Sequence, residues 1–506
     1  MMIPIHLEEG RREAGQKPIH APVLLHSKIQ REDKTVCEVG FDVSHVHFSP
    51  AGLPAMPFAG DVLCVMPENC QENIQKLILS LMIEEGVPVF LKGRFESDEG
   101  NFYDPEEAIK YVSLNPVKLP LLQALEAKLN DLSGIPPKWA EGYQKLRELL
   151  ALHLHHPDAC RKHLKHTHVT DVLAMFPGLL TLQELCTLQG AVGRRVYTIA
   201  SIKRDKKGNP QRINILLASD VSYTTPKEGF GRGGTYRGVC NAYLSDLLAN
   251  PHSSTATVFV QRRKYGAPEK NRAFSPYSSP QPDALFLDRL RMPLLMIAAG
   301  SGISGINAVL EERLAWKQKG YEVGTAKLLF GIHNREKDYL YEQLLKTYQE
   351  EGLLEKVLLA ESRPSAGKKQ YVQHLLVGGD YKQVFEGIVQ AKHGLVLCGD
   401  WKMGQSVLFG CLPFLLPFPL EKDTLDDTST EARLESLFLY AKGKIQALRE
   451  EGIIQASASG TRHAKRPFTF KDAMESLRKL KLDGLVLPSN SHNTLSSTQT
   501  DLASVS

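Results

Sequence analysis

The sequence predicts a β-rich part that is split by a block of helices and followed by an α/β part. Three observations lead to this prediction. Short apolar runs separated by Gly and Pro occupy residues 21–102 and 195–265, as is typical of strands. Leucines recur at helical spacing between these two regions. From residue 294 onward, strand-like and helix-like segments alternate, which indicates a parallel sheet with helices on both faces.

The β-rich part is expected to follow a flexible N-terminus at residues 1–20 and to cover residues 21–103 and 186–290. The helical block is expected at 104–185, where Leu121, Leu122, Leu125 and Leu129 begin the helical pattern. The clearest strands are Val62–Met66, Val89–Leu91, Val196–Ile202, Ile213–Ala218 and Ala256–Val260. The stretch from Tyr265 to Asp283 is rich in Pro, Ser and Gly and predicts a loop.

The α/β part is expected to cover residues 291–487, followed by a disordered tail at 488–506 that is rich in Ser and Thr. Its expected strands are Leu294–Ala298, Lys327–Gly331, Val357–Ala360 and Leu395–Cys398. Its expected helices are Ile303–Gly320, Glu336–Glu351, Gln383–Ala391, one near 430–450 and one near 470–481.

Composition excludes several classes of function. A net charge of +4 over 506 residues argues against a nucleic-acid partner. The most apolar stretch, Leu408–Leu420, has 13 residues with three prolines and is too short to span a bilayer. No basic start followed by an apolar run marks a signal peptide. The eight cysteines form no CxxC pair, so we expect reduced thiols and a cytoplasmic location.

Six short motifs follow one another between residues 195 and 400. They are Arg195-Val196-Tyr197-Thr198, Gly238-Val239-Cys240-Asn241, Gly300-Ser301-Gly302, Ser362-Arg363, Lys369-Gln370-Tyr371-Val372-Gln373 and Cys398-Gly399-Asp400. Their order and spacing resemble the FAD- and NADPH-binding half of the diflavin reductases, the family of cytochrome P450 reductase, the sulfite reductase flavoprotein and nitric oxide synthase. The resemblance implies a ferredoxin reductase-like fold: an antiparallel FAD-binding barrel with a helical connecting insertion, then a parallel-sheet NADP-binding domain. We expect this half without the family's FMN domain.

The resemblance assigns an FAD site to the first two motifs. Arg195 would pair with the FAD pyrophosphate, because a guanidinium matches phosphate oxygens bidentately. Tyr197 would stack on or edge the flavin, and the hydroxyl of Thr198, where the family has Ser, would reach the flavin N5. The loop of Gly238, Val239, Cys240 and Asn241 would lead into a helix beneath the pyrophosphate, since the amides of a helix N-terminus bind anions. Tyr223 stands where a family tyrosine touches FAD.

The later motifs resemble the family's NADPH site. Gly300, Ser301 and Gly302 follow an apolar strand, and glycines there let the backbone approach a pyrophosphate. Ser362, Arg363 and Lys369 supply a hydroxyl and two cations, which suit a 2′-phosphate and favour NADPH over NADH. An acidic residue at this strand end would have indicated NADH, and Glu361 stands one position earlier. In the family, Tyr371 and Gln373 complete this pocket, and an arginine stands at the position of His333.

The resemblance also names the residues at the transfer site. Cys398 would lie beside the nicotinamide C4 as a positioning group, with a buried strand cysteine as the plain structural alternative. Asp483 is a candidate match to the family's proton-handling aspartate. Four features depart from the family: Asn241, His333, Ser304-Gly305 in place of Ala-Pro, and the lack of an aromatic residue after Phe470.

The predicted function is an NADPH-dependent FAD flavoprotein reductase that passes electrons to a separate FMN, flavodoxin-like, haem or iron–sulfur protein. Two alternatives stay open. The departures from the family pattern would suit a non-catalytic scaffold that keeps the fold, and the flavin could instead reduce oxygen or quinones directly, as in an oxidase or diaphorase.

Two polar clusters invite other interpretations. The histidines at 153, 155, 156, 163, 166 and 168 match no tetrahedral metal spacing, so we expect solvated helix residues and no metal. Lys203-Arg204-Asp205-Lys206-Lys207 is expected to be a hairpin turn, with docking of an acidic partner as the alternative.

Overall fold

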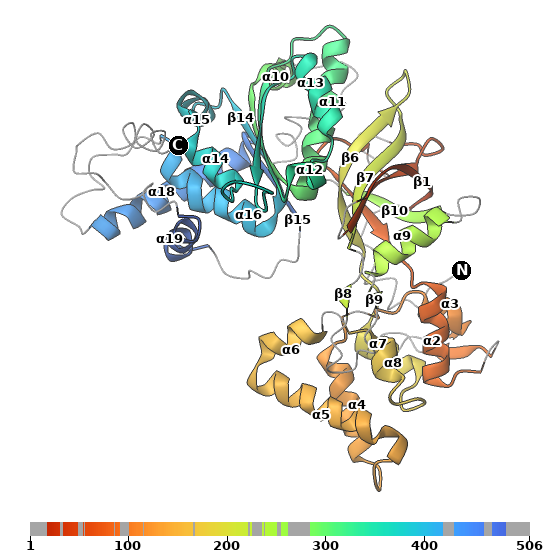
Figure 1. Ribbon diagram of the computed structural model, residues 1–506. Helices are drawn as coiled ribbons and strands as arrows, with labels where there is room; N and C mark the ends of the chain where they lie inside the picture. The colour runs from red at the N-terminus through yellow and green to blue at the C-terminus, as the bar shows by residue number, and fades with distance from the viewer. Residues whose placement is uncertain are drawn as a thin grey trace.

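The computed structural model describes residues 18–30, 34–48, 54, 56–84, 87–91, 101–114, 116–164, 167–220, 223–224, 235–236, 238–249, 255–261, 284–417, 430–459 and 468–481. Within them, three parts are visible: a β-barrel, a helical block below it in the view, and a layered α/β part beside it (Figure 1). The predicted fold class is confirmed, because the barrel strands are antiparallel and the second sheet is parallel.

Six strands close the barrel in the order β1-β10-β3-β6-β7-β2. Their bounds are β1 (Ile19–Gln30), β2 (Lys34–Asp42), β3 (Val62–Met66), β6 (Arg195–Arg204), β7 (Pro210–Asp220) and β10 (Thr255–Gln261). Branched and aromatic side chains such as Val39, Phe41, Ile199 and Ile215 fill the interior and are fully buried. Helix α9 (Val239–Ala249) packs on this core through Tyr243 and Leu244.

The helical block has a core of its own, built mainly from leucines. Its helices are α2 (Gln71–Leu81), α3 (Pro105–Ile109), α4 (Leu119–Asn130), α5 (Ala140–His155), α6 (Pro157–Leu164), α7 (Val169–Leu173) and α8 (Leu182–Gln189), with the 3₁₀ turn η1 (Pro137–Trp139). Two short hairpins, β4 (Val89–Leu91) with β5 (Asn101–Tyr103) and β8 (Tyr223–Thr224) with β9 (Thr235–Tyr236), lie outside the barrel sheet. The leucines that began the predicted helical pattern, Leu121, Leu122, Leu125 and Leu129, are buried together in α4.

The parallel sheet has the strand order β13-β12-β11-β14-β15. The strands are β11 (Leu294–Ala299), β12 (Ala326–Ile332), β13 (Leu354–Glu361), β14 (Gly394–Asp400) and β15 (Ile454–Ser459). One face carries α11 (Ile303–Gln318) and α13 (Glu342–Glu350), and the other carries α14 (Val372–Gly378), α15 (Lys382–Val389), α18 (Thr430–Glu450) and α19 (Phe470–Lys479). The remaining elements are α10 (Ala284–Arg291), η3 (Gly300–Gly302), α12 (Arg335–Asp338), α16 (Trp401–Gln405), the π-helical turn η4 (Ser406–Cys411) and α17 (Leu412–Leu415).

Three sequence-based expectations about elements are wrong. Residues 71–81 form helix α2 inside the stretch that was expected to be strand-like. The single helix expected at 336–351 is two helices, because the chain turns at Tyr341, whose φ of 58° is left-handed. Strand β14 is not the last strand of the sheet, since β15 pairs with it in parallel. Cys398 therefore lies on an inner strand, between β11 and β15.

Helix α11 lies against barrel strand β6, so the barrel and the sheet share a polar junction. Glu311 accepts hydrogen bonds from Ile202 N (3.2 Å) and from the Nζ of Lys203, and Glu312 accepts one from Ala59 N (3.0 Å). The basic run at 203–207 is the end of a hairpin, as expected. Lys203 pairs with Glu311, and the buried side chain of Arg204 lies near Glu312, so both contact α11.

Among the described residues, no helix is both long enough and apolar enough to cross a bilayer. All eight cysteines lie in the described part of the chain, and none of them forms a disulfide.

Candidate nucleotide and flavin sites

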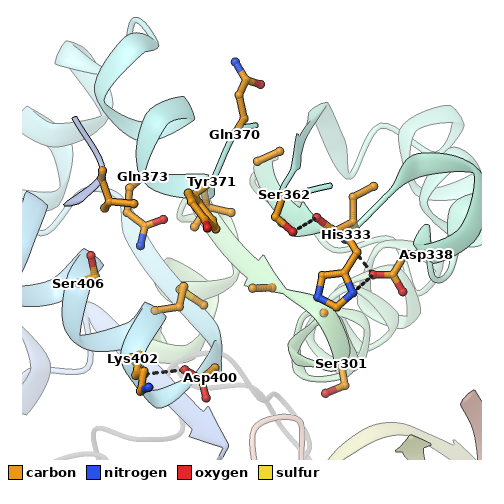
Figure 2. A pocket seen from close by; sticks show the side chains of 18 of the residues that line it. Ser301, His333, Asp338, Ser362, Gln370, Tyr371, Gln373, Asp400, Lys402 and Ser406 are labelled. Carbon is orange, nitrogen blue, oxygen red and sulfur yellow. Dashed lines mark hydrogen bonds and ion pairs between the residues drawn. The ribbon is translucent and has the colours of Figure 1, made fainter. Parts of the chain in front are cut away.

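The order of the parallel sheet locates the first site. The chain adds β12 and β13 on one side of β11, and then β14 and β15 on the other side. Ligands of open parallel sheets bind at the carboxyl ends of the strands where the order reverses. A cavity of about 650 Å³ lies at this point (Figure 2), and residues that end β11, β12, β13 and β14 line it.

Six of the residues predicted to bind NADPH line this cavity. They are Gly300, Ser301, His333, Ser362, Tyr371 and Gln373. Arg363 and Lys369 are exposed and do not line it. Lys369 nevertheless stays close, because its Nζ lies 5.0 Å from the centroid of the Tyr371 ring. The structure thus gathers segments that are up to 73 residues apart in sequence, from Gly300 to Gln373.

Two glycines let the backbone approach closely beside the cavity. A Cβ on Gly302 would lie 2.3 Å from the carbonyl oxygen of Cys398. A Cβ on Gly305 would lie 2.9 Å from Cys398 Sγ and 3.1 Å from Thr198 Cγ2. The two residues predicted to border hydride transfer, Thr198 of the barrel and Cys398 of the sheet, are therefore brought together across Gly305.

The turn after β13 is fastened to the end of β12. Ser362 donates from its N (3.0 Å) and from its Oγ (3.2 Å) to the carbonyl oxygen of Ile332. The backbone N of Arg363 donates to the carbonyl oxygen of His333 at 2.7 Å. The carboxylate of Glu361 accepts from the N of Arg335 at 2.9 Å and does not line the cavity. The acidic residue that would disfavour a 2′-phosphate is therefore turned to the start of α12.

Gln373 presents a polar atom to the cavity. Its side chain is 5% exposed, and its Oε1 has no hydrogen-bond partner among the described residues. A buried amide oxygen without a partner costs free energy. Figure 2 shows this side chain beside the cavity. A ligand that donates a hydrogen bond would satisfy it, so the cavity fits a polar ligand of nucleotide size.

His333 lies opposite, beside a buried carboxylate. The backbone N of His333 donates to Asp338 Oδ2 at 2.9 Å, and Nδ1 of its ring lies 3.7 Å from the same oxygen (Figure 2). The Asp338 side chain is 6% exposed, whereas that of His333 is 45% exposed. A protonated His333 would thus be held in the cavity wall by Asp338.

The predicted flavin residues meet on the barrel, although their motifs are more than forty positions apart. The hydroxyl of Tyr197 on β6 donates to the thiol of Cys240 at the start of α9, and Arg195 lies near both. Burial raises the pKa of Tyr197 well above its usual value and raises the pKa of Cys240 to about 11. Both groups therefore remain protonated and uncharged at neutral pH. Arg195 Nη1 donates to Gly193 O at 2.7 Å.

This region suits a flavin nucleotide. Gly238, Val239, Cys240 and Asn241 form the first turn of α9 and the residue before it, so their amides face outward at a helix N-terminus. Arg195 supplies a cation near this turn. An anionic pyrophosphate would be bound by the amides and the guanidinium together.

One wall of the cavity is formed by residues that belong to none of the sequence motifs. Ser476, Lys479 and Leu480 at the end of α19 line it, as do Lys402 and Ser406. The hydroxyls of Ser406 and Ser476 are 2.8 Å apart. Ser406 opens a π-helical turn, a form that is frequent at functional sites. The helical pattern near 470–481 predicted α19 but gave no sign that it reaches the cavity.

His374 ties α19 to the cavity. Its Nδ1 accepts a hydrogen bond from Tyr371 N (3.0 Å), and its Nε2 lies 2.9 Å from the carbonyl oxygen of Leu480. Because a carbonyl can only accept, Nε2 carries the ring proton and Nδ1 does not. The ring also stacks on Tyr371, with centroids 5.8 Å apart.

Two candidate residues lie partly or wholly outside the described residues. The backbone of Tyr223 belongs to β8, but its side chain is outside what the structure describes. Asp483 lies outside the described residues, as do 1–17 and 482–506. In the described part of the chain, no three His, Cys, Asp or Glu side chains gather as metal ligands.

Comparison with known proteins found a matching family model and several similar proteins. Residues 296–408 match the family model of the oxidoreductase NAD-binding domain. NADPH–cytochrome P450 reductase of Drosophila melanogaster is 27% identical over 275 residues, which is 54% of this chain and 34% of that protein. The sulfite reductase [NADPH] flavoprotein component of Saccharomyces cerevisiae is 27% identical over 230 residues (45% and 19%), and nitric oxide synthase of Bombyx mori is 30% identical over 254 residues (49% and 18%).

The parallel sheet with its cavity is thus similar to an oxidoreductase NAD-binding domain, and it is joined to an antiparallel β-barrel. Over about half of its length, the chain is similar to these members of the diflavin reductase family, which its motifs resemble. It spans about a third or less of the length of these curated relatives.

Proposed function

We propose that this protein is an NADPH-dependent FAD flavoprotein reductase that passes electrons to a separate acceptor protein. The observation that carries the proposal is the meeting of Thr198 and Cys398 across Gly305. This contact brings the barrel motif that is predicted to bind FAD close to the end of β14, which is predicted to bind NADPH. When bound, NADPH supplies a hydride and FAD accepts it before electrons pass on.

The chain's own residues would bind and align the two nucleotides. Arg195 and the first turn of α9 would bind the FAD pyrophosphate, and Tyr197, kept uncharged by burial, would border the flavin. Gly300 and Gly302 would let the backbone approach the NADPH pyrophosphate, and Gln373 would accept a hydrogen bond from the nucleotide. Cys398 would position the nicotinamide without reacting.

Selection of NADPH over NADH would depend on the turn after β13. Ser362 lines the cavity, and Arg363 and Lys369 are exposed on the segment that follows it. The Glu361 carboxylate supports this assignment, because it accepts a hydrogen bond from the backbone N of Arg335. Its negative charge, which would repel a 2′-phosphate, is thereby directed away from the cavity. His333, held by Asp338, would supply a further donor.

As the electron acceptor we propose a separate redox protein: an FMN or flavodoxin-like protein, a haem protein or an iron–sulfur protein. Support comes from the relatives, which are named for cytochrome P450, sulfite reductase and nitric oxide synthase. A scaffold that binds FAD without turnover and an oxidase that reduces oxygen directly are the competing functions, and the following experiment separates them.

The test is an anaerobic rapid-mixing experiment on the FAD-loaded protein. We expect NADPH to bleach the visible flavin absorbance and NADH to do so poorly. The variants Arg363→Gln and Lys369→Gln should each weaken NADPH binding by about tenfold, the value of one charge-assisted hydrogen bond, and should leave NADH binding unchanged. Lys356→Gln is the matched control, because Lys356 is exposed near the start of β13, the strand whose end leads to Arg363.

A protein that binds FAD but is reduced by neither nucleotide would reject the reductase and favour the scaffold. NADPH oxidation with stoichiometric peroxide in air, undiminished when candidate redox proteins are added, would favour the oxidase. Equal loss of NADPH binding in Lys356→Gln would reject the assignment of the 2′-phosphate site.

A further inference from the structure

Helix α11 packs against barrel strand β6 at a glycine, Gly305. Gly305 occupies the crossing, and a Cβ there would lie 3.1 Å from Thr198 Cγ2 and 2.9 Å from Cys398 Sγ. The separation of α11 from β6 therefore fixes how Thr198 and Cys398 are placed relative to each other. A glycine in the first turn of a helix contributes no side-chain packing and weakens the helix locally. Another residue must hold α11 at this distance.

Asn307 lies two positions further along α11 and makes two buried hydrogen bonds. Its side chain is 2% exposed. Nδ2 donates to the carbonyl oxygen of Ala200 at 2.9 Å, and Oδ1 accepts from the hydroxyl of Tyr348 at 3.1 Å. Ala200 is two residues after Thr198 on β6. Hydrogen bonds thus link α13 through Asn307 to β6, close to Thr198, which Gly305 contacts.

The orientation of the Asn307 amide follows from its partners. The carbonyl of Ala200 can only accept, so the NH₂ group must face it. The hydroxyl of Tyr348 must then donate to the amide oxygen. Burial raises the pKa of Tyr348 above its usual value, so this hydroxyl keeps its proton. Each polar atom of this contact is satisfied, and removal of one partner would leave a buried polar group unpaired.

The other links between α11 and β6 are further from the crossing. Lys203, which pairs with Glu311, has a side chain that is 48% exposed, and an exposed ion pair holds two elements together weakly. Glu312 bonds Ala59 on another loop. Asn307, in contrast, makes a buried side-chain hydrogen bond from α11 to β6 only two residues from Thr198.

We propose that Asn307 is a positioning residue for hydride transfer, oriented by Tyr348. The proposal rests on the proposed function, because it assumes that Thr198 and Cys398 border the two nucleotides. Asn307 fixes the helix whose glycine separates these residues. It touches neither nucleotide and acts only through the position of α11. A displacement of about 1 Å at a reacting centre slows chemistry by about a hundredfold.

Four variants test this role in the full-length protein. Asn307→Leu keeps the volume and removes both hydrogen bonds, and Tyr348→Phe removes only the donor to the amide. Asn307→Asp keeps the shape, and its neutral carboxyl can donate to Ala200 and accept from Tyr348, as the amide does. Asn69→Leu is the matched control, since Asn69 is also buried and bonds two carbonyls, those of Ile109 and Val112, within the helical block.

The first measurement is hydrogen exchange without FAD or nucleotide. Asn307→Leu should speed exchange in peptides covering 198–204 and 303–310, and Asn69→Leu should not. The second is the rate of flavin reduction at saturating NADPH, measured separately from the NADPH dissociation constant. We expect Asn307→Leu to slow reduction by about tenfold to a hundredfold and to change the dissociation constant by less than about twofold. Tyr348→Phe should show a smaller loss.

The pH profile of Asn307→Asp gives the sharpest distinction from a purely structural role. The titratable groups near this position are Tyr348 of α13, Glu311 of α11 and Glu38 of β2. Burial of this position and the negative charges of Glu311 and Glu38 favour the neutral form of the introduced carboxyl in this variant. Flavin reduction in this variant should therefore recover toward the wild-type rate as the pH falls, whereas Asn307→Leu should show no such recovery.

Several outcomes would reject the proposal. Reduction at the wild-type rate in Asn307→Leu would do so, as would a loss that follows the NADPH dissociation constant or appears equally in Asn69→Leu. A wild-type protein that NADPH does not reduce would instead reject the proposed function, and the positioning role with it. The wild-type rate therefore separates the two failures.

Discussion

Gly302 lies against the backbone of Cys398 with no room for a side chain between them. A Cβ on Gly302 would come within 2.3 Å of the Cys398 carbonyl oxygen and 2.7 Å of Gly399 Cα. These atoms belong to the backbone of an inner strand, so they cannot rotate away as a flexible side chain could. The turn after β11 and the end of β14 are thereby held in direct contact at the cavity.

The first prediction follows from this contact. Gly302→Ala should lower the free energy of unfolding by about 1–3 kcal/mol through overpacking and should weaken NADPH binding. Thermal unfolding and calorimetric titration measure the two effects. Gly443→Ala is the control, because nothing lies within 4 Å of a Cβ there and Ala favours a helix by up to about 1 kcal/mol. Wild-type stability and binding in Gly302→Ala would show that β14 can move.

The second prediction separates stability from binding at Gln373. Gln373→Leu removes a buried oxygen that lacks a partner among the described residues, so the melting temperature should stay equal or rise. NADPH affinity should fall by about tenfold. Gln189→Leu relieves a similar buried amide in the helical block and should leave NADPH affinity unchanged. An unaltered affinity in Gln373→Leu would contradict its place in the nucleotide site.

The third prediction concerns the link between Tyr371 and α19. His374→Phe keeps a ring that can stack on Tyr371 and loses both hydrogen bonds. We expect faster hydrogen exchange over residues 470–480 and weaker NADPH binding, since Lys479 and Leu480 line the cavity. His155→Phe, at the exposed end of α5, is the control. Unchanged exchange over 470–480 would mean that packing alone holds α19.

The fourth prediction concerns alkaline stability. Burial raises the pKa of Cys240 to about 11 in the folded protein, above the value of about 8.5 in an unfolded chain. The folded state therefore holds this proton more tightly. Its contribution to stability is complete below about pH 8.5 and is lost as the pH rises through about 11, by at most about 1.4 kcal/mol per pH unit.

Urea unfolding at about pH 8 and pH 10.5 tests this dependence. Cys240→Ala should lose less stability between the two values than the wild type does. Val239→Ala, a truncation at the neighbouring buried position, carries no titratable group and should keep the wild-type difference. Equal differences in all three proteins would show that the Cys240 thiol does not titrate differently on unfolding.

Much of the fold could be predicted because apolar runs and helical spacing report burial directly. Val62–Met66 forms a strand with the expected bounds, and the strands around Met296, Leu328 and Leu397 follow the expected alternation. Helix α2 carried a usable signal, since Ile74, Leu77, Ile78 and Leu81 recur at helical spacing and are buried. The short apolar runs on either side of it led to a prediction of strands instead.

Other features have no local signal. Four of the six residues of Ile454–Ser459 are Ser or Ala, and the segment is a strand because β14 offers it an edge to pair with. Tyr341 is left-handed although tyrosine rarely adopts that conformation, so the break before α13 was invisible. The motifs named the cavity residues at the ends of β11 to β14. No motif indicated that Lys402 and Ser476 line the cavity or that Asn307 bonds β6, because tertiary packing brings these residues there.

The wall formed by α19 sets an order of events during synthesis. The barrel is complete once β10 has left the ribosome, but the nucleotide cavity lacks a wall until Leu480 emerges. At about 5–20 residues per second, the ribosome needs about 10–40 s to make the intervening chain. A nascent chain can thus fold its barrel well before it can retain a nicotinamide nucleotide, so nucleotide capture reports that translation has passed the last helix of the sheet.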